Sequence, residues 1–210
     1  QKIGRAQTAD TGECFVFVHG GDYYMGLKGY ADGMGKLGFE TLAPEEIPDS
    51  SYDLRWESMD LESDWTLDLM IEKLDALKEM GVKQVTLDDG WYNDAGEWDL
   101  NEEKLPNGDA DMKRLTDAVH ERGMTAVLWW RPCDGGGRAG SSLYNEHPEY
   151  FVKNQKGSVA KLAGPGELDK FHGTTGYALC PSSEEAVQSQ VEFVRKAVET
   201  WGFDGLKSDS

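Results

Sequence analysis

Residues 79–91 read EMGVKQVTLDDGW, in which a helix end, a glycine and a short apolar strand follow one another directly. The same succession recurs as ERGMTAVLWWRP at 121–132 and as TWGFDGLKSD at 200–209. Each repeat places a glycine just past the helix, where a left-handed backbone conformation ends it. These glycines are Gly81, Gly123 and Gly202. Helices that alternate with strands in this way predict a parallel sheet with right-handed crossovers.

The helices between these strands carry apolar residues at helical spacing, which predicts one buried face on each helix. In the first helix this stripe consists of Leu67, Met70, Ile71, Leu74 and Leu77. In the last helix it consists of Val187, Val191, Val194, Val198 and Trp201. Ser182 and Glu185 have the spacing of a capping box at the start of that last helix. A further stretch, YDLRW at 52–56, brings the predicted strands to four.

Polar and aromatic residues stand at the end of every predicted strand. They are Trp56 for the first strand, Asp88, Asp89 and Trp91 for the second, Trp129, Trp130 and Arg131 for the third, and Lys207 and Asp209 for the fourth. Four strand and helix units form either half of an eight-stranded barrel or a small open sheet, and a barrel collects its strand ends around one pocket. We therefore predict an α/β fold in which residues 51–210 form about the first four units of a TIM (β/α)8 barrel.

Residues 1–50 do not show this alternation. ECFVFVHG at 13–20 predicts a short strand, and the residues from Asp22 onward predict a helix that internal glycines weaken. Residues 38–51 contain prolines and are typical of a linker. We interpret residues 1–50 as the tail of a preceding β-rich domain together with a linker.

The composition limits the partners of the protein. With 39 acidic and 21 basic residues its net charge is -18, so we expect neither nucleic acid nor an anionic membrane as a partner. No apolar run approaches the roughly 18 residues of a membrane span. Cys14, Cys133 and Cys180 lack metal-ligand spacing, which favours reduced thiols and a cytoplasmic rather than a secreted protein. The first residue is Gln, which leaves the question of a signal peptide open.

Lys207 and Asp209 are the residues at which we expect chemistry. They are two apart, so on a strand their side chains point the same way. An ammonium beside a carboxylate keeps that carboxylate ionised near neutral pH, which suits a nucleophile or an electrostatic stabiliser. The alternative interpretation is an ordinary surface ion pair that closes a strand.

Several of these segments, in their order along the chain, resemble the melibiase-type α-galactosidases of glycoside hydrolase family 36. The segments are LDDGWYNDAGEWDLNEEKLPNG at 87–108, LWWRP at 128–132, LYNEHPEYF at 143–151, YALCP at 177–181 and GFDGLKSD at 202–209. The resemblance extends from about Ser51 to the last residue. Two details depart from the family pattern: Trp130 and Arg131 follow Trp129 where relatives vary, and Glu97 precedes Trp98 where many relatives have an aspartate.

The resemblance implies a retaining glycoside hydrolase that acts on α-galactosides of the raffinose and melibiose type. It implies that Asp209 is the nucleophile, which forms a covalent glycosyl-enzyme, and that no cofactor or metal is needed. Residues expected to bind the oligosaccharide substrate are Asp88, Asp89 and Lys207 through sugar hydroxyls, Trp56, Trp91 and Trp129 as pocket walls, and Arg131 at the third strand end. In the resembled family the acid/base comes from a later strand, beyond residue 210.

Three alternatives stay open at this point. Asp88, Asp89 and Asp209 are carboxylates at strand ends, and such clusters also bind Mg²⁺. The chain is also compatible with a catalytically silent carbohydrate-binding barrel fragment. A glycosyl-transferring relative differs from a hydrolase only in which acceptor reaches the glycosyl-enzyme. The exact sugar, its linkage and any oligomerisation are not determined by the sequence.

Overall fold

The computed structural model describes residue 16 and residues 18–39, 42–93, 98–132, 142–160 and 177–209. The chain forms two compact units, Gln1–Tyr52 and Asp53–Ser210. In the first unit, the helix predicted from Asp22 is confirmed as α1 (Tyr23–Lys36), and the Asp22 side chain caps it by accepting from the Tyr24 N–H. The short 3-10 helices η1 (Pro44–Glu46) and η2 (Asp49–Tyr52) follow. The strand predicted at 13–20 lies largely outside the described residues, as do Cys14 and Cys133.

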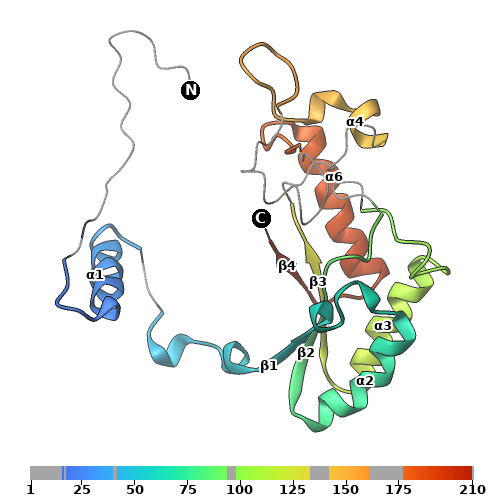
Figure 1. Cartoon of the computed structure of the whole chain (residues 1–210), viewed down its shortest axis with the longest axis horizontal. Coiled ribbons are helices and arrows are strands. Elements are labelled where there is room, and N and C mark those ends of the chain that lie inside the picture. Colours follow the sequence, from blue (N-terminus) through green and yellow to red (C-terminus); the bar gives the residue numbers. More distant parts are fainter. Residues whose placement is uncertain are drawn as a thin grey trace. The chain divides into compact units, whose positions relative to one another are not determined.

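The second unit contains a parallel sheet of four strands in the order β1-β2-β3-β4 (Figure 1). The strands are β1 (Leu54–Glu57), β2 (Val82–Leu87), β3 (Thr125–Trp130) and β4 (Gly205–Ser208). The long helices are α2 (Leu67–Glu79), α3 (Asp109–Glu121) and α6 (Glu184–Arg195), and α6 continues into the π-helical turn η5 (Lys196–Thr200). The shorter elements are η3 (Ser58–Asp64), α4 (Ser142–Glu146) and η4 (Pro148–Tyr150). The predicted alternation of strands and helices is confirmed.

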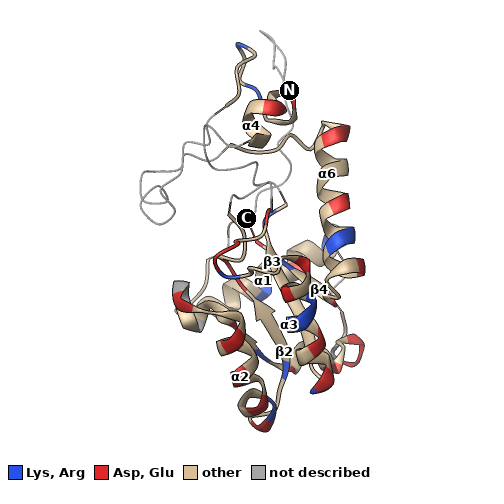
Figure 2. Ribbon diagram, turned by 90° about the vertical axis from the view of Figure 1, so that its right-hand side faces the viewer, with Lys and Arg blue, Asp and Glu red and all other residues tan. Residues whose placement is uncertain are grey.

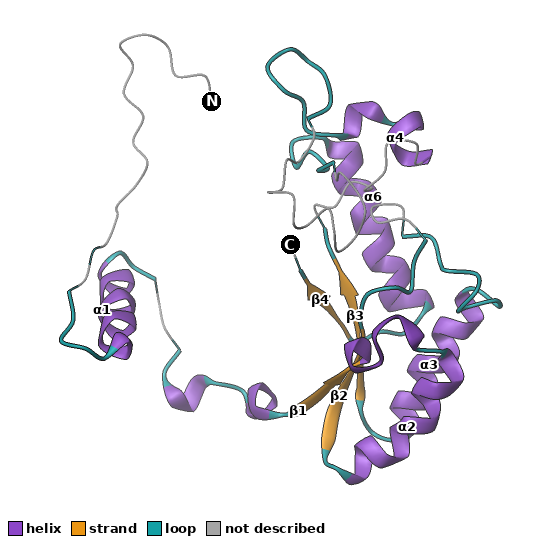
Figure 3. Cartoon of the chain, viewed as in Figure 1, coloured by secondary structure: helices purple, strands orange, loops and turns teal. Residues whose placement is uncertain are grey.

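The long helices lie on one side of the sheet (Figure 3), so its two faces differ. Side chains alternate between faces along each strand, and paired residues of parallel neighbours share a face. Trp56 pairs with Val85, which is buried in the core beneath the helices. Glu57 pairs with Thr86, Thr86 with Val127, and Val127 with Gly205. We call the face of Trp56 and Val85 the outer face, and the face of Glu57 and Thr86 the inner face.

The core lies between the outer face and the helices. The stripe predicted for α2 is confirmed, because Met70 and Leu74 are fully buried and Ile71 is half-buried. The stripe predicted for the last helix is confirmed only in part, because Trp201 is fully buried and Val194 packs against the core. The other three valines, Val187, Val191 and Val198, are 42 to 46% exposed. The buried residues of this helix and its last turn are Ala186, Gln190, Phe193, Ala197 and Trp201.

Aromatic packing explains which face of α6 is buried. Phe193 stacks on Trp91 with ring centroids 5.8 Å apart, and Trp201 meets Trp91 edge-on at 5.9 Å. Such rings bury far more area than valines do, so their contacts decide the orientation of the helix. The helix also begins one residue later than predicted, because Ser183 rather than Ser182 caps it by accepting from the Ala186 N–H.

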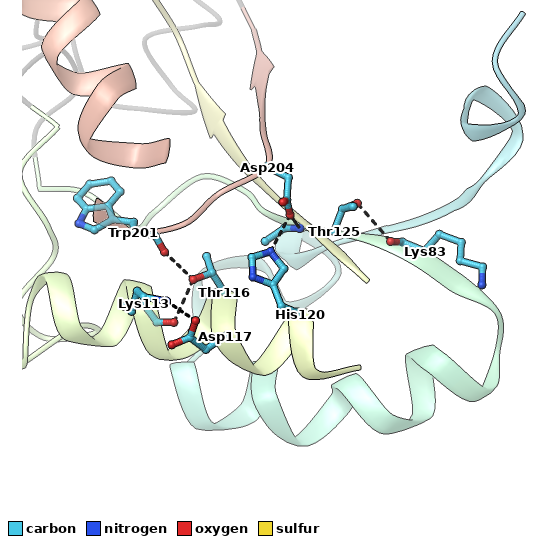
Figure 4. A network of polar contacts seen from close by, with 9 residues as sticks. Lys83, Lys113, Thr116, Asp117, His120, Thr125, Trp201 and Asp204 are labelled. Atoms are coloured by element: carbon cyan, nitrogen blue, oxygen red, sulfur yellow. Dashed lines mark hydrogen bonds and ion pairs between the residues drawn. The ribbon is translucent and has the colours of Figure 1, made fainter. Parts of the chain in front are cut away.

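The glycine after each helix adopts the predicted left-handed conformation, with φ of 88° at Gly81, 72° at Gly123 and 85° at Gly202. The chain around Gly202 is also tied to α3 (Figure 4), because the Thr116 hydroxyl donates to the Trp201 carbonyl at 2.5 Å.

A second contact in Figure 4 fixes the entry to β4. His120 of α3 lies 2.8 Å from the Asp204 carboxylate, which also accepts from the Ala126 N–H at 2.7 Å. His120 therefore links a helix to two strands, which is a structural role.

We expect Gly202→Ala to destabilise the fold more than Gly81→Ala. Both changes place a side chain in left-handed backbone, which costs about 1 to 2 kcal/mol. At Gly81 the added methyl group meets no atom within 4 Å, whereas at Gly202 it lies 3.2 Å from the Thr116 hydroxyl. Overpacking of this kind adds roughly 1 kcal/mol. Urea unfolding of both variants measures the difference, and equal losses would contradict the proposed contact.

Candidate active site

The ammonium of Lys207 joins three strands on the inner face. Its Nζ donates to Glu57 Oε2 and to Asp88 Oδ2, each at 2.7 Å. Glu57 ends β1, Asp88 follows β2, and Lys207 lies on β4. Three strand spacings on a flat sheet amount to about 14 Å. The contact between β1 and β4 therefore requires a strongly curved sheet, as in a barrel.

Asp88 is the most deeply buried charge of this site. Its side chain is 3% exposed, whereas those of Lys207 and Glu57 are 32% and 35% exposed. The Ser58 hydroxyl accepts from the Asp88 N–H at 2.8 Å, which secures the backbone. Burial alone lowers the pKa of Lys207, but the hydrogen bonds to Asp88 and Glu57 outweigh it and raise this pKa above its ordinary value. The ammonium is therefore charged across the neutral range, and it compensates a carboxylate that is removed from water.

A chain of contacts connects Asp89 with Asp209. The Tyr92 hydroxyl donates to Asp89 Oδ1 at 2.6 Å, and the Tyr92 ring stacks on Trp129 with centroids 6.0 Å apart. The indole Nε1 of Trp129 in turn donates to Asp209 Oδ2 at 3.1 Å. The backbone of Asp209 continues the sheet, because its N–H donates to the Trp130 carbonyl at 2.9 Å. Two carboxylates at different strand ends are thus oriented through one pair of aromatic rings.

A second lysine supports the turn that carries Asp89. The Trp65 indole donates to the Asp89 carbonyl at 3.3 Å, and the Lys104 ammonium lies 4.3 Å from the centroid of the Trp65 ring. Burial lowers the pKa of Lys104, while the charges of Asp89 and Asp64 act in the opposite direction. The turn passes through Gly90 at φ 92°, where an added side chain would meet both Lys104 and Trp65 at 3.5 Å.

The structure brings five of the eight predicted site residues to this region through direct contacts. These are Asp88, Asp89, Trp129, Lys207 and Asp209. Arg131 lies beside them, with its guanidinium carbon 5.3 Å from the centroid of the Trp129 ring. Trp91 is fully buried, and its indole donates to the Trp129 carbonyl at 3.1 Å, so it supports Trp129 from behind.

The placement of Trp56 differs from the expectation that it lines the pocket. It pairs with Val85 on the outer face and packs against the core beneath the helices. The reason is the alternation of side chains along β1, which sends Trp56 and its neighbour Glu57 to opposite faces. Glu57, rather than Trp56, is the β1 residue at the site.

The residues predicted to bind the sugar do not include Glu57 or Tyr92, and from the sequence Glu57 was only a fallback candidate for the acid. A signal for Glu57 was present, because it follows the first strand directly and the register of four strands would place it opposite Thr86. Tyr92 had no such signal, since its role depends on a contact with Asp89 that the turn geometry creates.

The alternative of a magnesium site concerns the carboxylates of Asp88, Asp89 and Asp209. In the described part of the chain, no three His, Cys, Asp or Glu side chains are grouped so as to hold a metal ion. The Lys207 ammonium instead occupies the position beside Asp88 that a cation would take.

The chemistry of the site suits a polyhydroxylated ligand. Carboxylate oxygens accept hydrogen bonds from hydroxyl groups, and aromatic rings contact the C–H surface of a sugar. Acidic residues are also spread over α2, α3 and α6 (Figure 2), in keeping with a net charge of -18 that disfavours anionic ligands. None of the helices that the structure describes is long and apolar enough to cross a membrane.

Comparison with known proteins identifies relatives of one kind. The sequence profile of the family described as melibiase matches residues 54–201. An A type blood alpha-D-galactosamine galactosaminidase from Flavonifractor plautii is 56% identical over 207 residues, which cover 99% of this chain and 19% of that protein. The alpha-galactosidase Mel36A from Lactobacillus acidophilus is 32% identical over 96 residues, or 42% of this chain and 12% of that protein.

The solved structures agree with these relatives. An alpha-galactosidase from Thermus thermophilus, in complex with p-nitrophenyl alpha-D-galactopyranoside, superposes with a TM-score of 0.64 at 29% identity. The match covers 75% of this chain and 30% of that structure. The chain thus spans 19% of the length of the galactosaminidase and 30% of the solved galactosidase.

We expect Lys207→Met to lower the free energy of unfolding by about 2 kcal/mol, because it leaves the buried Asp88 carboxylate without its countercharge. Adding Asp88→Asn should recover part of this loss, since the amide carries no charge. Lys113→Met is the matched control, because its pair with Asp117 is about half exposed and worth under roughly 1 kcal/mol. Chemical denaturation of the protein that carries this chain measures all of these variants. A loss no larger than that of Lys113→Met would show that Asp88 does not depend on Lys207.

Proposed function

Since the chain belongs to the melibiase family, we propose that the protein that carries it is a retaining glycoside hydrolase acting on α-linked galactose-type sugars. The observation that carries this proposal is the position of Asp209, which follows β4 and accepts a hydrogen bond from Trp129 while Lys207 holds Asp88 on the same face. Glycoside cleavage needs three groups on this side of the sugar: a carboxylate nucleophile, a buried carboxylate that accepts hydrogen bonds from sugar hydroxyls, and an aromatic ring.

In the proposed mechanism, Asp209 attacks the anomeric carbon and forms a covalent glycosyl-enzyme that water then hydrolyses. The hydrogen bond from the Trp129 indole to Oδ2 orients the carboxylate for the attack. Asp88, Asp89 and Lys207 bind sugar hydroxyls. Retaining enzymes place the second carboxyl about 5 to 5.5 Å from the nucleophile. We assign this acid/base to a residue outside positions 1–210.

A second candidate substrate is an α-linked galactosamine. It is favoured by the 56% identity to a galactosaminidase, which extends over 99% of this chain. The chemistry is compatible, because a protonated amine at C2 would find the carboxylates of Asp88, Asp89 and Asp209 at the strand ends of the site. Parallel assays with the nitrophenyl α-glycosides of galactose and of galactosamine discriminate between the two sugars.

The remaining alternatives predict different readouts. A glycosyl-transferring relative would release less free sugar than nitrophenol when a second sugar is present as acceptor, since part of the glycosyl-enzyme would be captured by it. A silent carbohydrate-binding protein would bind the sugar without releasing nitrophenol.

We expect Asp209→Asn in the complete protein to reduce turnover by several powers of ten while sugar binding is largely retained, because the amide cannot act as a nucleophile. Steady-state kinetics and calorimetric titration with the free sugar measure the two effects. As a control, Asp117→Asn removes a carboxylate of an exposed pair on α3 and should leave both unchanged. Near wild-type turnover of Asp209→Asn would refute the assignment.

Asp209→Ala provides a positive test of the same role. The smaller side chain leaves room for azide, which should restore turnover of an activated nitrophenyl substrate by attacking the anomeric carbon itself. The expected product is a glycosyl azide of inverted anomeric configuration. Rescue without a glycosyl azide would show that Asp209 is not the nucleophile.

Replacing Asp89 with Ala should raise the Michaelis constant and lower turnover, because a hydroxyl contact that strengthens in the transition state is lost. We expect the specificity constant to fall by at least about tenfold. Tyr92→Phe is the companion variant, since it keeps the ring stacked on Trp129 but removes the hydrogen bond to Asp89 Oδ1. We expect its specificity constant to fall by less than that of Asp89→Ala. An unchanged specificity constant for Asp89→Ala would mean that this residue is structural.

A further inference from the structure

Glu57 is a charged residue of the site for which the mechanism above has no role. It ends β1 on the inner face, and its Oε2 accepts from Lys207 at 2.7 Å across a separation of 150 residues. Its side chain is 35% exposed, so it is not confined by burial. Asp88 by itself already neutralises the ammonium. Charge balance alone therefore does not explain why a second carboxylate is placed there.

We propose that Glu57 is a positioning residue, which holds the Lys207 ammonium in the one orientation that presents its remaining N–H to a hydroxyl group of the bound sugar. The inference rests on the proposed function, because it assigns a task within the same sugar site.

The geometry of the ammonium is the basis for this inference. An ammonium has three N–H donors, and the two carboxylates take two of them. Lysine is a compact charge on a flexible stem, so a single anchor at Asp88 would leave the ammonium free to rotate about that contact. A second anchor from another strand removes this freedom. The third N–H then has a fixed direction before any ligand arrives, which reduces the entropy lost on binding.

The pKa of Lys207 is consistent with a role of Glu57 in the position of the ammonium rather than in its charge. Burial lowers this pKa, and the hydrogen bonds to Asp88 and to Glu57 raise it further than burial lowers it. Because Asp88 remains, the ammonium should still be charged near neutral pH when Glu57 is replaced. Glu57 variants should therefore alter the affinity for sugar without moving the pH profile at neutral pH.

A purely structural role predicts a different result. The Glu57 and Lys207 side chains are about one-third exposed, and ion pairs of this exposure contribute little to stability. If Glu57 only connected β1 to β4, replacing it would shift the unfolding midpoint slightly and leave the affinity of the folded protein for sugar unaltered.

The test uses the complete protein and the variants Glu57→Gln, Glu57→Asp, Glu57→Ala and Lys207→Met. Glu57→Gln keeps an oxygen that accepts from Lys207, so its affinity for sugar should fall by less than about threefold. Glu57→Asp keeps the charge but withdraws the carboxylate by one methylene, and Glu57→Ala removes it. Both should weaken binding of galactose or galactosamine about tenfold and raise the Michaelis constant similarly, with turnover within about threefold.

The double variants decide whether Glu57 acts through Lys207. In the Lys207→Met background, Glu57→Ala and Glu57→Asp should cause no further loss of affinity, because the group that they position is gone. Asp75→Asn is the matched control, since Asp75 pairs with Arg122 at 2.7 Å between α2 and α3 and should leave binding unchanged. If Glu57→Ala does not fold, Glu57→Asp supplies the same cycle.

Three results would overturn the inference. Equal affinity of wild type, Glu57→Asp and Glu57→Ala would show that the second anchor is dispensable. A further tenfold loss in the Lys207→Met background would show that Glu57 contacts the sugar directly. Loss of affinity in Glu57→Gln as large as in Glu57→Ala would show that charge rather than position matters. If wild type binds neither sugar, the proposed function itself fails, which is distinguishable from all three.

Discussion

The hydrogen bonds of the Lys207 ammonium to Glu57 and Asp88 are the constraint on which the rest of the site depends. They connect the first and last strands of a sheet whose order is β1-β2-β3-β4, so they form only if the sheet curves. Curvature in turn brings the ends of all four strands toward a common point, as in the barrels of the structural relatives. The same ammonium compensates the buried negative charge of Asp88, whose side chain is 3% exposed.

An aromatic cluster supports this polar site from the outer face and the strand ends. Trp91 contacts Trp98, Phe193 and Trp201, and it donates to the carbonyl of Trp129. Trp129 lies between the two groups, because its ring stacks with Tyr92 while its indole donates to Asp209. The packing of large rings thus sets both the orientation of α6 and the orientation of a carboxylate. Stability and the proposed chemistry therefore share the same residues, which is why changes to Trp129 or Trp91 would not separate the two.

The relatives and the geometry constrain the function in complementary ways. Family membership rests on the melibiase profile over residues 54–201, and the relatives act on galactose-type sugars according to their names. The geometry adds which side chains of this chain lie together: carboxylates as acceptors, one ammonium as donor, and aromatic surface. The identity of 56% to a galactosaminidase makes the substituent at C2 of the sugar the main question of specificity.

Much of the fold and part of the site follow from the sequence alone. The left-handed glycines at Gly81, Gly123 and Gly202, the parallel βα alternation and the location of Asp88 and Lys207 at strand ends were predictable, because they depend on local backbone preferences and on where strands end. The hydrogen bond between Asp88 and Lys207 was not predicted, since the sequence placed Lys207 beside Asp209. Three features depended on tertiary structure. The buried face of α6 was decided by ring packing around Trp91, and the face of Trp56 by the register of β1 with β2. The position of Glu57 after the predicted first strand was readable, but its contact with Lys207, across 150 residues, depends on the curvature that brings β1 to β4.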